Sequence, residues 1–331
     1  MAYGPSAAQN GAQSGIAEYV EASPAFGFRA ERFDSNPIIH REMAGLAGES
    51  GQNINGPSLI RVPDWIEDPL GRYYLYFAHH SGRYIRLAYA DELEGPWKVV
   101  PGGVLPIRET PVYDEDGRRH IASPDVHIDE DQQRIRMYYH GNPPPTDDIP
   151  YQMTFAALSA DGLEFNSLPD PLGLFYFRTI EHGGWHYAFA KYINDGGVLY
   201  RSRDGLTDFV EGPRILPRVR HTALLEHEGR LYVFFSRGGD APEHIMVSRV
   251  ENMDANWLNW RFTRPQSVLM PEEDYEGAGE PIEPSEFGST GNVVHQLRDP
   301  AIFEENGRIY LLYSTAGERA LAMARLHYEE W

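Results

Sequence analysis

The chain has 331 residues, with 29 Lys and Arg against 49 Asp and Glu, so its formal net charge is −20. It has no cysteine, which excludes disulfides, thiolate metal sites and a cysteine nucleophile. The negative charge repels nucleic-acid phosphates, and no apolar run approaches the roughly 18 residues that a membrane span needs. We therefore expect neither a nucleic-acid partner nor a membrane partner.

The N-terminal region, residues 1–35, precedes the first repeated segment of the chain. Its first residues, MAYGPSAAQNGAQSG, have neither the basic nor the apolar segment of a secretory signal. This predicts a cytoplasmic protein. We expect residues 1–35 to form an N-terminal arm that packs against the domain that follows.

One pattern recurs five times after the arm: a short apolar segment, a turn with Gly or acidic residues, and an aromatic-rich alternating strand. In chain order the copies begin at Asn55 (NGPSLIRVPDWIEDPLGRYYLYFAHHSG), Ala122 (ASPDVHIDEDQQRIRMYYHG), Tyr176 (YFRTIEHGGWHYAFAKY), Arg220 (RHTALLEHEGRLYVFFS) and Arg298 (RDPAIFEENGRIYLLYS). The last two copies align without a gap, which matches Asp299 with His221. Each copy is followed by a further alternating segment.

Period-2 alternation bounded by Gly, Asp and Pro indicates antiparallel strands rather than helices. Five such meanders, spaced by about 40–80 residues, predict an all-β fold, a five-bladed β-propeller over residues 36–331. A β-sandwich shares the turns and the alternation, but similarity at a long period favours the propeller. The polar segment 271–292 is too long for a passive turn, so we expect a functional loop over one face or a partly disordered segment.

In a propeller, the innermost strands start at the face to which the second strands return, so these ends surround one axial opening. The first strands bring Asn55, Ser58, Ser123, Asp125, Tyr176, Arg178, Arg220, His221, Arg298 and Asp299, and the second strands bring His79, His80, His140, Lys191, Arg237 and Ser314. This set is basic although the chain is acidic. It predicts a polar substrate, or one with an anionic group.

Several motifs resemble those of the five-bladed propeller glycosidases, namely glycoside hydrolase family 43 and its relatives, families 32, 117 and 130. The resemblance covers roughly residues 36–326. Asp299 in RDPAIF looks like the catalytic Asp that opens an innermost strand in those families, and Asp125 in SPDV looks like their second, tuning Asp. GPWK around Trp97 and NPIIHRE from Asn36 are similar to further family segments. The resemblance implies a glycosidase.

Two departures from the family pattern concern the acid and the base. The first blade, where family 43 has its base, carries Asn55-Gly56-Pro57-Ser58 and no carboxylate. The family's acid is a Glu on the third blade, but the repeat alignment puts Glu181 at the far-end turn and excludes it. The remaining candidates for the acid are Glu283 and Glu286 on the long loop, or a histidine.

Glycoside hydrolysis needs a proton donor for the leaving oxygen and a carboxylate that activates water or attacks. We expect Asp125, Asp299 and His221 to be catalytic, because a His can serve as acid or base near neutral pH. The expected substrate-binding residues are Asn55, Ser58, His79, His80, His140, Tyr176, Arg178, Lys191, Arg220, Arg237 and Arg298. The arginines suit anionic groups, and an equally good role for them is to neutralise Asp125 and Asp299 in ion pairs.

No cofactor is expected to be required, and no tight metal-ligand spacing occurs in the sequence. An axial divalent cation such as Ca²⁺ would need only oxygen, water or imidazole ligands, so the identity of any metal is unknown. The expected partner is a carbohydrate substrate, and assembly into a homo-oligomer is left open.

The resulting hypothesis is a glycoside hydrolase that cleaves a glycosidic bond in a polar or anionic oligosaccharide at the axial pocket. A phosphorylase or a lyase on the same scaffold is the first alternative. The second is a noncatalytic carbohydrate-binding propeller, which the missing first-blade carboxylate favours.

Overall fold

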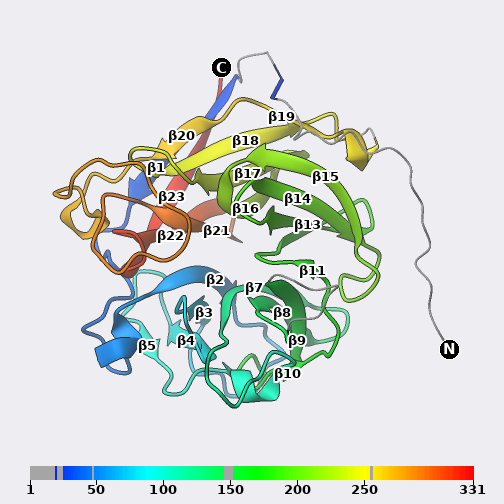
Figure 1. Cartoon of the computed structure of the whole chain (residues 1–331), viewed down its shortest axis with the longest axis vertical. Helices are drawn as coiled ribbons and strands as arrows, with labels where there is room; N and C mark the ends of the chain where they lie inside the picture. The colour runs from blue at the N-terminus through cyan, green and yellow to red at the C-terminus, as the bar shows by residue number, and fades with distance from the viewer. Residues whose placement is uncertain (1–18, 21–24, 47, 145–151, 254–255) are drawn as a thin grey trace.

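Five separate antiparallel sheets surround a central axis in the computed structural model (Figure 1). The structure describes residues 19–20, 25–46, 48–144, 152–253 and 256–331. Within these residues, no helix is long and apolar enough to cross a membrane. The arrangement confirms the predicted all-β, five-bladed propeller.

Each sheet is one blade, and its strands follow one another outward from the axis. Blade 1 consists of β2 (Asn55–Arg61), β3 (Tyr73–Ala78), β4 (Tyr84–Ala90), β5 (Lys98–Val99) and β6 (Leu105–Pro106). Blade 2 consists of β7 (Ile121–Asp129), β8 (Arg134–Gly141), β9 (Met153–Ser159), β10 (Asn166–Ser167) and β11 (Gly173–Leu174). Blade 3 consists of β12 (Arg178–His182), β13 (Trp185–Tyr192), β14 (Gly196–Ser202) and β15 (Val210–Pro217). Blade 4 consists of β16 (Val219–His227), β17 (Arg230–Arg237), β18 (Ile245–Glu251), β19 (Arg261–Phe262) and β20 (Gln266–Leu269). Blade 5 consists of β21 (Arg298–Glu305), β22 (Arg308–Thr315), β23 (Ala320–Glu330) and β1 (Phe26–Arg32). The described 3₁₀ helices are η1 (Gly48–Gly51), η2 (Ile107–Glu109), η3 (Trp257–Asn259) and η4 (Asp274–Glu276).

The alternating sequence of the strands places apolar side chains on both faces of each blade. In β3, Leu75 and Phe77 pack against blade 5, whereas Tyr74 and Tyr76 pack against blade 2. Successive residues of a strand point to opposite faces, so one strand can serve two cores. The described residues form one such apolar core between each pair of neighbouring blades, which explains why the sequence is rich in aromatic residues on both strand faces.

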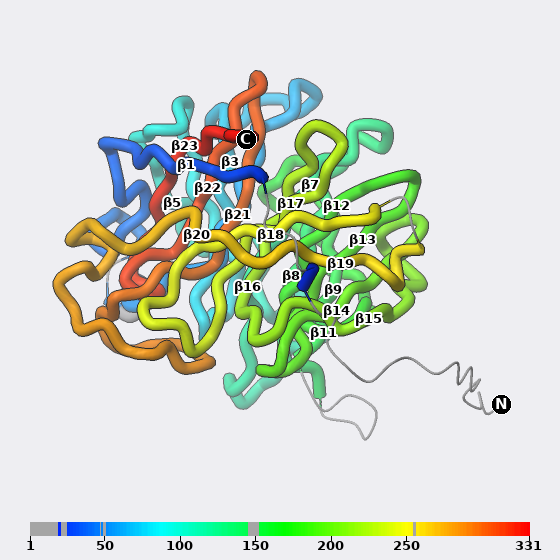
Figure 2. The backbone as a smooth tube through the Cα atoms, turned by 90° about the horizontal axis from the view of Figure 1, so that it is seen from above, coloured from blue at the N-terminus to red at the C-terminus, as the bar shows by residue number. Residues whose placement is uncertain are grey.

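Blade 5 is completed by the N-terminal strand β1, which pairs antiparallel with β23 from Phe26 opposite Glu330 to Arg32 opposite Ala324. The two strands lie side by side in both views (Figure 1, Figure 2). Residues 26–32 of the arm predicted over 1–35 are therefore the outermost strand of a blade. Residues 1–18 and 21–24 of that arm lie outside the described residues.

The innermost strands β2, β7, β12, β16 and β21 close into a ring. Strand β2 contacts both β7 and β21, and β16 contacts both β12 and β21. Between β7 and β12 the ring is held by side chains, because Asp125 Oδ2 accepts a hydrogen bond from the Thr179 N–H at 2.8 Å. Arg178 donates in the other direction, to the Pro124 carbonyl, at 2.5 Å. Blades 2 and 3 thus depend on a buried carboxylate for their inner contact.

Candidate active site

An unusual backbone conformation opens four of the innermost segments. Gly56, Ser123, Tyr176 and Asp299 have φ of 59°, 49°, 64° and 49°, in the left-handed region that residues other than Gly seldom adopt. The strand register shifts at three of these positions, between Asn55 and Ser58, Ala122 and Asp125, and Arg298 and Ala301. Bulges of this kind redirect side chains, and strained backbone gathers at functional sites. Here the bulges lie at the start of the innermost strands β2, β7 and β21.

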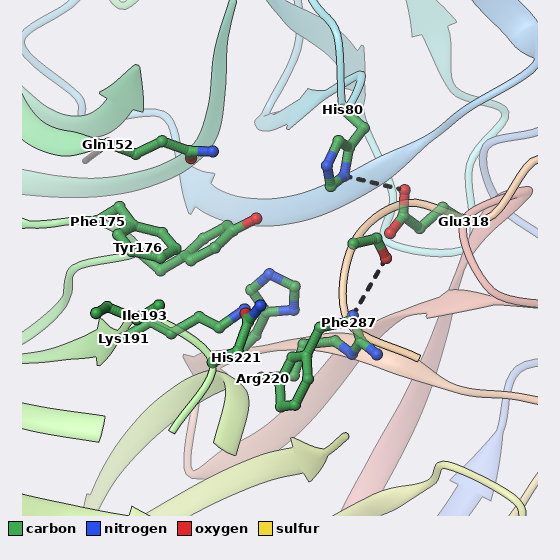
Figure 3. Close-up of a pocket in the computed structure, with 12 residues that line it drawn as sticks. His80, Gln152, Phe175, Tyr176, Lys191, Ile193, Arg220, His221, Phe287 and Glu318 are labelled. Carbon is green, nitrogen blue, oxygen red and sulfur yellow. Dashed lines mark hydrogen bonds and ion pairs between the residues drawn. The ribbon is translucent and has the colours of Figure 1, made fainter. Parts of the chain in front are cut away.

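A pocket of about 250 Å³ lies at this end of the axis (Figure 3). It is lined by His80, Gln152, Phe175, Tyr176, Lys191, Ile193, Asn194, Arg220, His221, Phe287, Gly288 and Glu318. Figure 3 shows Tyr176 and Lys191 extending from one wall towards His80 and Glu318 on the other. The volume falls just below the range of about 300–1,000 Å³ typical of small-molecule sites, so the pocket suits a single small polar unit.

Glu318 supplies a carboxylate to the pocket wall. It lies in the turn after β22, where Arg298 contacts Oε1 at 3.1 Å and Asn55 donates to Oε2 at 3.1 Å. His80 Nδ1 is 3.5 Å from Oε2. Burial alone raises the pKa of this carboxyl, but the interactions with His80 and Arg298 outweigh burial and lower it to about 2. Glu318 is therefore ionised at neutral pH.

Asp299 and His221 form a buried pair next to Glu318. His221 Nδ1 contacts Asp299 Oδ1, and Ser314 donates to Oδ2 at 2.8 Å. Burial lowers the pKa of His221, whereas the imidazole and the Ser314 hydroxyl outweigh burial and hold the pKa of Asp299 well below its ordinary value. Nδ1 of the ring faces Asp299, which leaves Nε2 to face a ligand.

Lys191 brings an amine into an aromatic cage. Its Nζ lies 4.7 Å from the ring centre of Phe287 and 5.6 Å from those of Phe175 and Tyr176. No described residue forms an ion pair or a side-chain hydrogen bond with this amine. Burial, followed by the charge of Arg220, lowers the pKa of Lys191 to about 7.

The arginines predicted to bind anionic groups are neutralised by carboxylates. Arg220 donates to Glu243 at 2.7 Å and Arg298 contacts Glu318, all with side chains no more than 2% exposed. Arg178 and Arg237 likewise pair with Asp125 and Asp240, at 3.6 and 3.0 Å. All four predicted anion-binding arginines therefore take part in ion pairs. The basic opening expected from the sequence is close to electrically balanced.

Asp125 does not reach this pocket. It lines a second cavity of about 320 Å³ together with Ser58 and Arg178, and the two pockets share no lining residue. The prolines of NGPS, ASPD and RDPA occupy equivalent bulges, so Asp299 corresponds to Ser123. Asp125 is two residues further along its strand, with Ser58 and Ala301 as its equivalents. The predicted acidic pair of Asp125 and Asp299 is thus separated along the axis.

The remaining predicted residues divide between the wall of the pocket and its surroundings. His80, Tyr176, Lys191, Arg220 and His221 line it directly. Asn55 and Arg298 donate hydrogen bonds to Glu318. The buried ring of His140 packs on the ring of Tyr176, with ring centroids 4.2 Å apart. His79 accepts a hydrogen bond from the Ser81 N–H at 3.0 Å, and neither His79 nor Arg237 lines the pocket.

Sequence reasoning missed Glu243 and seven residues that line the pocket: Gln152, Phe175, Ile193, Asn194, Phe287, Gly288 and Glu318. Glu318 follows the second strand of blade 5, as His80 follows that of blade 1, so the same topological argument could have found it. Phe287 comes from the long loop, whose Gly288 carbonyl accepts hydrogen bonds from Arg220 and Arg298 at 3.2 and 3.1 Å. The loop residues proposed as acids, Glu283 and Glu286, are exposed and do not line the pocket.

A divalent cation does not fit the donors present. Across the described part of the chain, no group of three or more His, Asp or Glu side chains is arranged to hold a metal ion. The carboxylate on the pocket wall, Glu318, is already engaged by Arg298, and Asp299 is engaged by His221. We therefore derive no step through the Ca²⁺ considered from the sequence.

No family model matches the chain. Solved structures with the same fold include a GH43_1 enzyme from Xanthomonas citri, with a TM-score of 0.57 over 83% of this chain and 88% of that one, at 16% identity. A GH43 beta-xylosidase/alpha-arabinofuranosidase from a compost microbial metagenome gives 0.55 over 91% and 94%, at 14% identity. The Bombyx mori GH32 beta-fructofuranosidase gives 0.54 over 83% and 59%, at 14% identity. These likenesses confirm the predicted resemblance in fold to propeller glycosidases.

A relative is also found among curated proteins. The uncharacterized protein R118 of Acanthamoeba polyphaga mimivirus is 33% identical over 327 residues, which cover 89% of this chain and 89% of that protein. The chain therefore belongs to the same family as this mimivirus protein.

Proposed function

We propose that the protein is a glycoside hydrolase that removes a terminal sugar from a polar oligosaccharide at the axial pocket. One observation carries the proposal: Glu318, an ionised carboxylate, lies on the wall of a small polar pocket at the axis of a propeller. The fold is shared with enzymes described as GH43 and GH32 glycosidases. The acidic pair expected from the sequence does not form at this pocket, because Asp125 lines another cavity.

Glu318 can supply the carboxylate that glycoside hydrolysis needs. An ionised carboxylate can take a proton from water and can stabilise the positive charge that develops on the sugar ring. Arg298 and Asn55 hold its oxygens in place, so little reorganisation is needed during the reaction. His221, oriented by Asp299, accepts a hydrogen bond from a sugar hydroxyl, and Tyr176 offers an aromatic face.

The pocket favours a polar sugar over a strongly anionic one. Arg220 and Arg298 are neutralised by Glu243 and Glu318, which leaves Lys191 as the cation without a described ion-pair partner. A pocket of about 250 Å³ has room for one sugar unit rather than an extended chain. We infer that the enzyme acts at the end of a glycan.

The test is a panel of aryl glycosides and oligosaccharides, with xylo-, arabinofurano-, fructofurano- and uronic acid members, followed by NMR detection of products. Glu318→Gln keeps the size of the side chain and removes its basicity. We expect it to reduce kcat/KM by about 10²–10⁴, the usual contribution of a catalytic acid or base. Glu283→Gln, on the exposed part of the long loop, is the matched control and should leave kcat/KM unchanged.

Three results would contradict the proposal. Full activity of Glu318→Gln would place the chemistry elsewhere. Turnover that depends on added inorganic phosphate would identify a phosphorylase instead. Sugar binding detected by NMR without any product after long incubation would identify a noncatalytic binding protein.

A further inference from the structure

We infer that Lys191, rather than a carboxylic acid, is the proton donor to the leaving oxygen in the proposed reaction. The inference rests on the proposed function, and it names the group that hydrolysis requires and that the sequence left unidentified. It follows from the partners of each titratable side chain at the pocket.

The carboxyl groups of Glu318 and Asp299 are held in their ionised form by their neighbours. Glu318 contacts Arg298, whereas Glu243, which does not line the pocket, accepts from Arg220 and from Ser236, both at 2.7 Å. Asp299 contacts His221 and accepts from Ser314. Hydrogen bonds and cations that stabilise a carboxylate disfavour the acid form. A protonated carboxyl group, the usual donor in glycoside hydrolysis, is therefore not available here.

Lys191 has the opposite environment. Its amine is enclosed by the rings of Phe287, Phe175 and Tyr176. The charges of Arg220 and Arg298 disfavour a further positive charge there, Glu243 and Asp299 favour it, and burial is the largest effect, so that the pKa is lowered overall. Desolvation and a neighbouring cation both make an ammonium group a stronger acid. The pKa of about 7 that results matches the value at which a general acid is most effective at neutral pH.

The geometry lets the two groups act on one sugar. Lys191 comes from the end of β13 and Glu318 from the turn after β22, so that they approach the pocket from different blades (Figure 3). The glycosidic C–O bond breaks, and its oxygen takes the Nζ proton of Lys191. The hydroxide part of one water bonds to the anomeric carbon, and the remaining proton of that water passes to solvent. Glu318 stays ionised and stabilises the positive charge that develops on the sugar ring. Solvent then reprotonates Lys191.

The first measurement does not need activity. The chain has only two lysines, Lys98 and Lys191. Protein labelled with carbon-13 lysine therefore gives two side-chain signals, which Lys191→Arg assigns by removing one. We expect the Cε shift of Lys191 to titrate with a midpoint of about 7. A midpoint above about 9 overturns the inference, because such an ammonium is a poor acid at neutral pH.

The second measurement compares leaving groups within each variant. A 2,4-dinitrophenyl glycoside needs no protonation, whereas an alkyl or natural glycoside does. For Lys191→Met and Lys191→Arg we expect kcat/KM to fall by about 10²–10⁴ on the poor leaving group and by less than about tenfold on the activated one. The leaving-group ratio, which is kcat/KM on the activated substrate divided by kcat/KM on the poor one, is measured within each sample. It therefore does not depend on how much of a variant folds.

The controls separate rival roles. If Lys191 only binds an anionic group, Lys191→Arg retains the wild-type ratio, which overturns the inference. If His80 is the donor, His80→Gln shows the leaving-group dependence and the Lys191 variants do not. A wild-type protein that cleaves neither substrate overturns the proposed function, and the role of Lys191 with it. Wild-type cleavage combined with an unchanged ratio in both Lys191 variants overturns the inference alone.

Discussion

Asp125 should stabilise the propeller without serving the reaction, and Asp125→Ala tests this. In the structure its Oδ2 accepts from the Thr179 N–H and contacts His127 Nε2, both at 2.8 Å, and Oδ1 is 3.6 Å from Arg178. The truncation leaves the Thr179 N–H without its acceptor and Arg178 without its buried counter-charge. Removing one partner of a buried pair typically destabilises by about 3–5 kcal/mol.

The expected size of the effect on thermal unfolding follows from the length of the chain. With an unfolding entropy of about 2.1 cal/mol/K per residue, a loss of about 3–5 kcal/mol lowers the Tm of a cooperative unit of this size by about 4–7 °C. Differential scanning calorimetry measures the shift. Asp131→Ala, at an exposed position of the same β7–β8 hairpin, is the control and should change Tm by less than about 1 °C.

The effect should also depend on pH. Burial alone raises the pKa of Asp125, but His127, Arg178 and the Thr179 N–H outweigh burial and lower it below the ordinary value of 3.8. A carboxyl whose pKa is lower in the folded state stabilises the fold above its unfolded pKa, and this stabilisation is lost as the pH falls through the folded pKa. The Tm difference should therefore be full above pH 5 or so and shrink towards pH 3.

Two outcomes would refute the reasoning about Asp125. A variant with wild-type Tm would show that the carboxylate does not hold blades 2 and 3 together. A variant that is folded at the assay temperature but loses kcat/KM by about a hundredfold or more would return Asp125 to the catalytic site.

Further predictions concern the lysine cage and the closure of blade 5. Phe287→Ala admits water to Lys191, so its pKa should rise from about 7, and the falling limb of kcat/KM should move to higher pH. Arg32→Ala removes the cation paired with the fully buried Glu276 at 2.9 Å, which should destabilise by about 3–5 kcal/mol in urea unfolding. Deletion of residues 1–32 removes β1 and exposes the edge of β23, so light scattering should show more self-association than for the full chain.

The fold could be predicted because every blade repeats the same physical requirement. Alternation of the kind seen in β3, with Leu75 and Phe77 on one face and Tyr74 and Tyr76 on the other, satisfies two apolar cores at once. The convergence of strand ends also follows from the topology. It correctly placed five side chains on the pocket wall, among them Tyr176, Lys191 and His221.

The details of the site depended on features that alternation does not contain. The bulges in β2, β7 and β21 set which residue of a motif faces the pocket, so an offset of two residues sends Asp125 to another cavity while Asp299 stays beside His221. Glu243 and Phe287 come from connections with no repeated pattern. Because the carboxylates were missed, the opening seemed basic from the sequence, although Glu243 and Glu318 neutralise it.

The pairing of β1 with β23 has a consequence for synthesis of the protein in the cell. The two partners are about 300 residues apart in the chain, so β1 leaves the ribosome long before the strand that receives it. Contacts of such long sequence separation slow folding, because a large loop must close before they form. Blade 5 can become complete only after β23 has been synthesised, and until then the pairing edge of β1 has no partner strand.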